Sequence, residues 1–501
     1  MSHARVATRC RNGISAPLLW VETHLSPGLP TVAMVGASDV VVKDAKERVR
    51  SAIISSGFRW PDSRLTINFS PAGVYKAGAN IDLPIAVSVL VASDQLPGTF
   101  AKTAEFYGEL SLDGKILPSR GLLAASASHR PSKTAIYVPE ENAATFARAE
   151  GDVFGLKYLS ELRSTDTLKR SIAQPGHTSK DTSDHHTFQL PAGQDSLWRA
   201  AEITAAGGHH LLMSGEPGAG KTMTAGLIQK LLPELSKQEA LETRILFDIA
   251  DEPLSGARPF RSPHHSISLP GLVGGTRLAA PGEISLAHNG ILFLDELPEF
   301  SLTTIEALRQ PLEAGYIQVT RAEQSHRYPA HFQLVAAMNP CPCGYRHSHV
   351  NPCRCSASAL SRYDNKLSGP LLDRIDIFIN VTRSTVADVI APQTNLFERF
   401  NAVRDRVETA WETALSRQGQ VNGRVRGDQL LDVCELAPTT RKWIEQTGER
   451  LALTGRGLHR CLRVARTIAD LSNVKVVTQT EISEALAYRA HVSSKEMCAR
   501  P

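Results

Sequence analysis

One eight-residue segment, GEPGAGKT at Gly215–Thr222, restricts the fold of this chain more than any other feature. The segment follows an apolar run, HHLLMSG, and precedes another, TMTAGLIQKLL, so the expected order is strand, glycine-rich loop and helix. A strand that passes into a helix through such a loop is typical of an α/β fold with a parallel sheet. The glycines let backbone N–H groups surround phosphates, and the helix amino terminus favours negative charge.

This loop predicts a site for ATP and Mg²⁺. We expect Lys221 to reach the terminal phosphates and the Thr222 hydroxyl to ligate the metal ion. The alternative, a glycine turn that matches the motif by chance, does not explain the strand and helix on either side. The predicted nucleotide-binding residues are Gly215, Glu216, Pro217, Gly218, Ala219, Gly220, Lys221, Thr222 and Met223.

A second motif, ILFLDE at 291–296, places two carboxylates after a fully apolar strand. Four apolar residues in a row are typical of a strand buried in a parallel sheet, and ligands lie at the carboxyl ends of such strands. We expect Asp295 to hold Mg²⁺, directly or through water, and Glu296 to orient and deprotonate the attacking water. The alternative is a strand capped by solvated acids.

The bulk properties of the chain restrict its class. Its 501 residues exceed one hydrophobic core, so two to four domains are expected. The net charge of +4 is too small for a uniformly basic nucleic-acid-binding molecule, so any DNA-binding surface must be local. No apolar run approaches the roughly 18 residues of a membrane span, and the first residues lack the apolar core of a signal peptide. We therefore expect a cytoplasmic protein without a membrane partner.

Composition and periodicity divide the chain into four parts. Residues 1–163 alternate strand and helix patterns, with a hairpin predicted at Asp113-Gly114. Residues 164–187 are rich in Ser, Thr, Asp, Lys and His and predict an exposed linker. Residues 188–382 resume the alternation of strands and helices, and residues 383–501 are helical.

Four motifs, GEPGAGKT, ILFLDE, AAMNP and SGPLLDRIDI, resemble those of AAA+ ATPases and occur in the same order. The resemblance implies that Asn339 is the sensor-1 residue, which contacts the attacking water or the γ-phosphate. It also implies that Arg374 is an arginine finger that acts on the γ-phosphate of a neighbouring subunit. The alternative for Arg374 is a surface ion pair with Asp373 or Asp376.

The segment GLHRCLRVART resembles the helix that carries the sensor-2 arginine of AAA+ lids. Arg460 and Arg463 lie three residues apart and therefore near one helix face. We favour Arg463, although either side chain fits the pattern and either fits a plain solvated arginine. A finger that acts in trans requires an oligomer, and identical head-to-tail contacts close into a ring. The resemblance implies six subunits.

Longer segments resemble the YifB/ComM family of magnesium-chelatase-like AAA+ proteins. They include RPFRSPHHSISLPGLVGG, PGEISLAHNGILFLDELPEF, AAMNPCPCG, LRVARTIADL and GLPTVAMVGASDVVVKDAKERVRSAI, and they extend over nearly the whole chain except the linker. The resemblance implies a hexameric DNA helicase that drives branch migration during natural transformation. Two rival functions are a motor that inserts Mg²⁺ into a porphyrin and a protein-remodelling chaperone.

The amino-terminal part resembles the Lon-type protease domain in SPAGVYKAGANIDLPIAVSVL and GELSLDGKILPSRGLLAA. That family uses a serine that a lysine deprotonates. The resemblance places Asn80 at the serine position and Gly121 and Leu122 at the lysine position. We therefore expect a Lon-protease-like α/β fold (1–163) without proteolysis, then the AAA+ core (188–382) and a helical lid (383–501).

Two insertions relative to a minimal ATPase core carry basic residues. One is Leu254–Ile284, and the other is the hairpin-like GYIQVTRAEQSHRYPAHFQ. Such insertions line the central pore of related ring motors, where basic tips would grip DNA phosphates in a salt-dependent way. The alternative is a pair of solvated loops. The predicted DNA contacts are Arg321, Arg327, His264 and His265, and Arg258, Arg261, Arg277 and His326 are further basic residues of these insertions.

Four of the eight cysteines fall in one short insert, 341–355. Four thiolates complete a tetrahedral Zn²⁺ site, although each pair here encloses one residue where common zinc knuckles enclose two to four. His347 and His349 are alternative ligands, and reduced free cysteines are the other interpretation. A metal would brace Asn339 and the segment that leads to Arg374. The four predicted ligands are Cys341, Cys343, Cys353 and Cys355.

Overall fold

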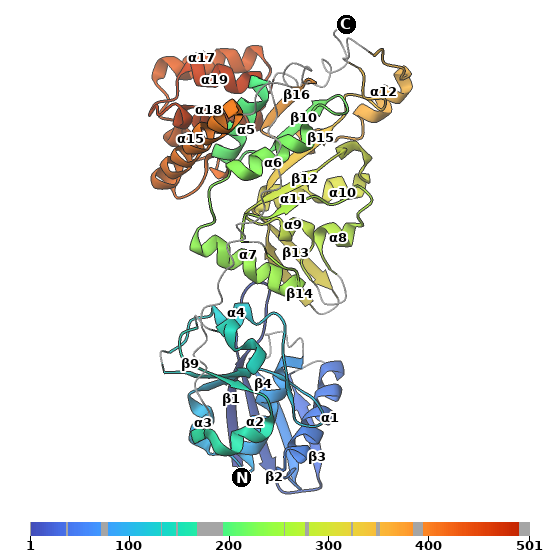
Figure 1. Cartoon of the computed structure of the whole chain (residues 1–501), viewed down its shortest axis with the longest axis vertical. Helices are drawn as coiled ribbons and strands as arrows, with labels where there is room; N and C mark the ends of the chain where they lie inside the picture. Colours follow the sequence, from blue (N-terminus) through green and yellow to red (C-terminus); the bar gives the residue numbers. More distant parts are fainter. Residues whose placement is uncertain are drawn as a thin grey trace. The chain divides into compact units, whose positions relative to one another are not determined.

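The computed structural model describes residues 2–36, 39–71, 79–131, 133–146, 149–167, 194–254, 256–275, 280–321, 324–346, 351–383 and 394–489. Contacts divide the chain into two compact units, and Figure 1 labels many of their helices and strands. The first unit combines 1–181 with 241–256 and 318–328, and the second combines 182–240, 257–317 and 329–501.

The first unit contains a seven-stranded mixed sheet in the order β3-β4-β2-β1-β5-β8-β9. Strand β4 alternates buried and half-exposed side chains, because only one face of this strand meets the core. Helix α2 is buried along its whole length and packs on β1 and β2. The strands are β1 (Ser2–Arg9), β2 (Leu18–Ser26), β3 (Thr31–Val35), β4 (Arg64–Ser70), β5 (Ala104–Phe106), β8 (Ala135–Pro139) and β9 (Asp152–Leu156).

Shorter elements complete this amino-terminal part. The predicted hairpin is present, since β6 and β7 pair antiparallel on either side of Asp113-Gly114. The helices are α1 (Asp39–Ser55), α2 (Asp82–Ala92), α3 (Gly98–Lys102), α4 (Leu123–Ser126), η1 (Ala79–Ile81), η2 (Glu140–Phe146) and η3 (Leu159–Thr167), and the hairpin strands are β6 (Glu109–Leu110) and β7 (Ile116–Leu117).

Two segments from later in the chain also belong to the first unit. One is the second half of helix α7 (Lys237–Ala250), where Ile245 packs in the same apolar cluster as Tyr107 and Leu122. The other comes from the paired strands β13 (Tyr316–Arg321) and β14 (Gln324–Pro329), which form the predicted hairpin.

The second unit is built on a parallel five-stranded sheet in the order β11-β12-β15-β10-β16. Every side chain of β12 and β15 is buried, as the continuous apolar runs predict. All carboxyl ends therefore meet at one edge and all amino ends at the other. The strands are β10 (Leu211–Gly215), β11 (Phe260–Arg261), β12 (Ile291–Leu294), β15 (Gln333–Met338) and β16 (Ile377–Val381).

Helices that precede and follow these strands along the chain complete the α/β core. Figure 1 shows α5 and α6 beside the strands β10, β15 and β16. The helices are α5 (Asp195–Gly207), α6 (Lys221–Leu231), α8 (Leu269–Val273), α9 (Glu283–Leu286), η4 (Leu297–Glu299), α10 (Leu302–Ala307), α11 (Arg309–Ala314), α12 (Ala357–Asp364) and α13 (Gly369–Leu372).

The carboxyl-terminal helices share one hydrophobic core with this sheet, where Val407 and Ala465 lie in the same cluster as Met213. The threonines Thr454 and Thr478 cap α18 and α19 through their hydroxyls, as expected for helix starts. These helices are drawn in red tones in Figure 1. They are α15 (Thr394–Gln418), η5 (Asn422–Arg424), α16 (Leu430–Cys434), α17 (Pro438–Arg450), α18 (Gly455–Leu471) and α19 (Gln479–Ala487).

The predicted fold class is confirmed: a mixed α/β protein with a parallel sheet and carboxyl-terminal helices. Most of the predicted linker, 164–187, lies outside the described residues, and the boundaries at 163 and 382 stay predictions. Within the described part, no helix has both the length and the apolar character needed to span a bilayer.

Candidate functional site

The glycine-rich loop connects β10 to α6 at the carboxyl edge of the parallel sheet. Gly218 and Gly220 have φ angles of 76° and 91°, a region that side-chain-bearing residues rarely adopt. A Cβ on Gly215 would lie 2.4 Å from the carbonyl oxygen of Val381 on β16. These three glycines are therefore required by the backbone path, and the first N–H groups of α6 remain available to a phosphate.

The ammonium group of Lys221 is held beside this loop by three oxygens. Its Nζ donates to the carbonyls of Gly215 at 2.7 Å and Glu216 at 3.1 Å, and to Oδ1 of Asn339 at 3.0 Å. Burial lowers the pKa of Lys221, while the charges of Asp295 and Glu296 oppose that shift. The Lys221–Asn339 contact joins two motifs that lie 118 residues apart in the sequence.

The residues predicted to hold Mg²⁺ lie together. The Thr222 hydroxyl donates to Oδ2 of Asp295 over 3.2 Å, and the Glu296 N–H donates to Oδ1 of the same carboxylate over 2.9 Å. Hydroxyl and carboxylate oxygens are the ligands that Mg²⁺ prefers, along with water and substrate phosphates. Thr222 and Asp295 therefore fit the residues that would hold a magnesium ion.

Glu296 adopts a left-handed backbone conformation, with φ at 51° and ψ at 46°. A non-glycine residue seldom takes this conformation, and such positions cluster at functional sites. Its carboxylate is half-exposed, and Oε2 lies 3.8 Å from Nδ1 of His265. The sequence did not predict this neighbour. His265 lies near Glu296 because β11 pairs in parallel with β12, so the residues after both strands meet at the carboxyl edge of the sheet.

Arg374 lies at the opposite, amino-terminal edge, just before β16. Its guanidinium is buried: Nη2 pairs with Oε1 of Glu313 at 2.5 Å, and Nε donates to the Arg309 carbonyl at 3.2 Å. A third N–H donates to the Pro370 carbonyl. The ion pair that we considered as the alternative is therefore wrong in its partner, since Glu313 rather than a neighbouring aspartate holds Arg374.

The two sensor-2 candidates have different contacts. Arg460 Nη1 donates to Oδ1 of Asp376 and to the Arg374 carbonyl, each over 2.7 Å. Arg463 donates Nε to the Val425 carbonyl at 2.8 Å, and its guanidinium makes no other hydrogen bond within the described part of the chain. Burial lowers the pKa of Arg463. Arg460 therefore ties α18 to the sheet, whereas Arg463 keeps donors available to an anion.

A cavity of about 680 Å³ opens at this amino-terminal edge. His210, Gly290 and Gln333, which stand at the starts of β10, β12 and β15, contribute to its wall. Its remaining lining is strongly basic, with Arg258, Arg424, Arg426, Arg456, Arg460 and Arg463. Because a five-residue strand such as β10 is roughly 17 Å long, these arginines cannot reach phosphates at the loop of the same chain.

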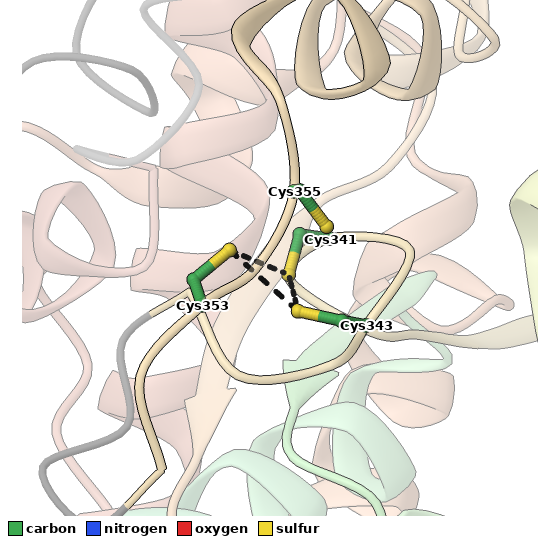
Figure 2. Close-up of side chains that lie close together, drawn as sticks. All are labelled: Cys341, Cys343, Cys353 and Cys355. Carbon is green, nitrogen blue, oxygen red and sulfur yellow. Dashed lines mark hydrogen bonds between the residues drawn. The ribbon is translucent and has the colours of Figure 1, made fainter.

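The four clustered cysteines converge, as Figure 2 shows. The Sγ atoms of Cys341, Cys343 and Cys353 are separated by 3.4, 3.6 and 3.7 Å, and all four thiols lie within 4.8 Å of one another. Zn–S bonds of about 2.3 Å in a tetrahedron place sulfurs roughly 3.8 Å apart. The donor set therefore fits Zn²⁺. His347 and His349 lie outside the described residues.

The basic residues of the two insertions differ in their exposure and in the unit to which they belong. His264 is exposed, with Nδ1 2.8 Å from Ser266 Oγ. His326 is buried within the first unit, with Nδ1 3.2 Å from Oδ1 of Asn12, and the Arg327 backbone faces Gly13. Arg277 and the side chain of Arg321 lie outside the described residues.

Two other basic residues of the first insertion have structural partners. Arg258 is buried and donates to the carbonyls of Pro233 and Asn289. Arg261 forms a two-bond pair with Glu283, each bond 2.6 Å long. These contacts leave the guanidinium groups of Arg258 and Arg261 less available to DNA phosphates than the sequence suggested.

The positions that the Lon-type resemblance singles out carry no nucleophile or base. The Asn80 carbonyl accepts from the Gly108 N–H in the first unit. Gly121 has a φ of 72°, and Leu122 is buried in the apolar cluster. Neither position supplies the serine or lysine that proteolysis needs.

Comparison with known proteins agrees with this architecture. Three family models match the chain: magnesium chelatase subunit ChlI over 188–389, subunit ChlI of Mg-chelatase over 21–142, and the ChlI carboxyl-terminal region over 398–489. YifB of Salmonella typhimurium is 41% identical over 499 residues, which cover 98% of this chain and 97% of that protein. The competence protein ComM of Haemophilus influenzae is 40% identical over 509 residues, which cover 98% of both chains.

These matches extend over nearly the full length, and they include the phosphate loop, both sheet edges and the carboxyl-terminal helices described above. The chain therefore belongs to the YifB/ComM family of magnesium-chelatase-like AAA+ ATPases.

Proposed function

We propose that this protein hydrolyses ATP with Mg²⁺ at the carboxyl edge of its parallel sheet. The observation that carries the proposal is the hydrogen bond between Lys221 Nζ and Asn339 Oδ1, with Thr222 and Asp295 bonded beside it. Lys221 neutralises the terminal phosphates, and Thr222 and Asp295 would hold the metal ion, which neutralises charge on the phosphates. Glu296 accepts a proton from the attacking water, and Asn339 orients that water.

Hydrolysis on this proposal needs a neighbouring subunit. Arg374 and Arg463 lie at the amino-terminal edge, away from the loop of their own subunit, so they would act on the nucleotide of the next one. Repetition of this head-to-tail contact closes a ring, and the AAA+ family favours six members. Arg374 stabilises transition-state charge, and Arg463 contributes a second cation.

We propose that ATP hydrolysis drives the movement of DNA. We infer a helicase that drives branch migration in natural transformation and recombination, acting in the cytoplasm, from the likeness to ComM, whose name marks it as a competence protein. Arg321, Arg327, His264 and His265 are the proposed DNA contacts. The likeness to ChlI favours a second candidate, a chelatase-type ATPase subunit, and a protein-remodelling chaperone is a third.

We also propose a structural Zn²⁺ on the cysteine cluster. The support is the separation of the sulfurs, which matches that of a tetrahedral zinc–thiolate centre. The absence of any disulfide among these four cysteines agrees with thiolates that remain available to a metal.

The test is ATP turnover of the full chain with and without forked DNA, a porphyrin or an unfolded protein. Lys221→Ala and Glu296→Gln should lower turnover at least about 100-fold. Lys230→Ala and Glu299→Gln, at exposed positions nearby, are matched controls that should retain it. DNA should raise the wild-type rate. Turnover that survives in Lys221→Ala would overturn the ATPase, and stimulation by porphyrin or unfolded protein alone would overturn the DNA motor.

A further inference from the structure

The cysteine cluster lies directly against the phosphate loop. Gly344, which follows Cys343, has a φ of 85°, and a Cβ built on it would lie 2.7 Å from Cδ of Pro217. Pro217 is the third residue of the glycine-rich loop. The two loops therefore touch, and only a residue without a side chain permits this approach.

The two ends of the cysteine insert are also tied to the nucleotide site. At the first end, Cys341 follows Asn339 by two residues, and Asn339 accepts from Lys221 Nζ at 3.0 Å. At the second end, Cys355 stands two residues before α12, whose Tyr363 donates its hydroxyl to the Asn339 carbonyl at 3.1 Å. Displacement of either end of the insert would therefore change the position of Asn339.

Loop contacts rather than regular secondary structure hold the insert. Between β15 and α12 its described residues form no helix or strand. The ion pair of Arg346 with Asp364, at 3.2 Å, connects the insert to α12. Sulfurs 3.4–3.7 Å apart suit thiolates that share one cation, which would offset their mutual repulsion. A metal ion bound here would thus cross-link the two ends of the insert.

We propose that the metal ion on Cys341, Cys343, Cys353 and Cys355 supports the phosphate loop, by holding Gly344 against Pro217 and Asn339 against Lys221. This inference deepens the proposed function, since it assumes that nucleotide binds at this loop and zinc at the cysteines. Loss of the metal lets the insert move and weakens nucleotide binding. The rest of the second unit persists, because the hydrophobic cluster shared by the sheet and the carboxyl-terminal helices contains none of the four cysteines.

The test uses the full-length protein and two readouts, zinc per chain by plasma mass spectrometry and the Kd of a fluorescent ATP analogue. Cys353→Ser should lose zinc and weaken analogue binding by roughly tenfold or more. The matched control is Cys434→Ala, a cysteine in α16 that is remote in sequence from the insert, which should keep both. Circular dichroism checks that each variant is folded.

A second variant keeps the experiment decisive if Cys353→Ser does not fold. Gly344→Ala retains all four thiols but adds the Cβ that would overlap Pro217. It should keep its zinc and still weaken analogue binding. Wild-type protein without zinc, or zinc-free protein that binds the analogue as wild type does, would overturn the inference. Wild-type binding by Lys221→Ala would instead overturn the proposed ATP site and leave the zinc result standing.

Discussion

Arg374 and Glu313 form an ion pair at the amino-terminal edge of the parallel sheet, with 2.5 Å between Nη2 and Oε1. The Arg374 side chain is 7% exposed and that of Glu313 is 50% exposed, so the carboxylate covers the guanidinium. Glu313 also lies 4.0 Å from Arg456, and it is the one carboxylate among the described residues that line the basic cavity. If Arg374 acts in trans as we propose, Glu313 occupies the place that the phosphate would take.

Replacing Glu313 with glutamine should raise ATP turnover at low protein concentration. The neutral amide of glutamine competes less than a carboxylate with the γ-phosphate for Arg374. Because a half-exposed ion pair is worth at most about 1 kcal/mol, the rise in turnover should be no more than roughly fivefold. The measurement is turnover across a protein dilution series. Glu306→Gln, which instead removes a pair with Arg309, is the control. Lower turnover in Glu313→Gln would show that the carboxylate positions Arg374 rather than competes for it.

Mixing two inactive variants should restore turnover if Arg374 acts in trans. An Arg374→Ala subunit still carries Lys221, and a Lys221→Ala subunit still carries Arg374. At a one-to-one ratio, roughly a quarter of the interfaces in a head-to-tail ring join the two intact halves. Each variant alone serves as the control. A mixture no more active than its components would contradict a shared site.

Loss of His265 should slow turnover without weakening ATP binding much. Its Nδ1 lies 3.8 Å from the Glu296 carboxylate, so we expect it to orient that base in addition to its proposed contact with DNA. His265→Ala should lower kcat by roughly tenfold and leave KM within a factor of about three. His129→Ala, which removes an exposed histidine of the first unit, is the control. Equal losses in both variants would contradict a specific role for His265.

Acidification should destabilise the second unit through His210. Burial lowers the pKa of His210 to about 4, and Arg460 and Arg463 act in the same direction. The unfolded chain therefore binds a proton at higher pH than the folded chain, and stability falls as the pH drops from about 6.5 towards 4. The loss is at most about 3 kcal/mol, and less where cavity water screens the ring.

The measurement is urea unfolding between pH 7.5 and pH 5. His210→Asn retains an acceptor for the Leu334 N–H, which bonds His210 Nδ1 at 3.1 Å, and it should show a shallower pH dependence. His3→Asn, at an exposed position of β1, should retain the wild-type slope. An unchanged slope in His210→Asn would assign the acid sensitivity to other groups.

Sequence alone determined the local parts of the nucleotide site. GEPGAGKT between apolar runs predicted β10, the loop and α6, and ILFLDE predicted a buried strand that ends in Asp295 and Glu296. These predictions succeed because backbone dihedral angles and apolar periodicity depend on neighbouring residues. The AAA+ resemblance predicted that Asn339 contacts the attacking water or the γ-phosphate, whereas its hydrogen bond to Lys221 came from the structure.

Only the tertiary structure decided which charged side chains are available. It paired Arg374 with Glu313, occupied Arg460 with Asp376, left Arg463 facing the cavity, and brought His265 to Glu296. It also placed Gly344 against Pro217. These partners lie far apart in the chain, and no local pattern encodes them, because the partner of a charged side chain depends on how the strands are ordered and how the helices pack on them.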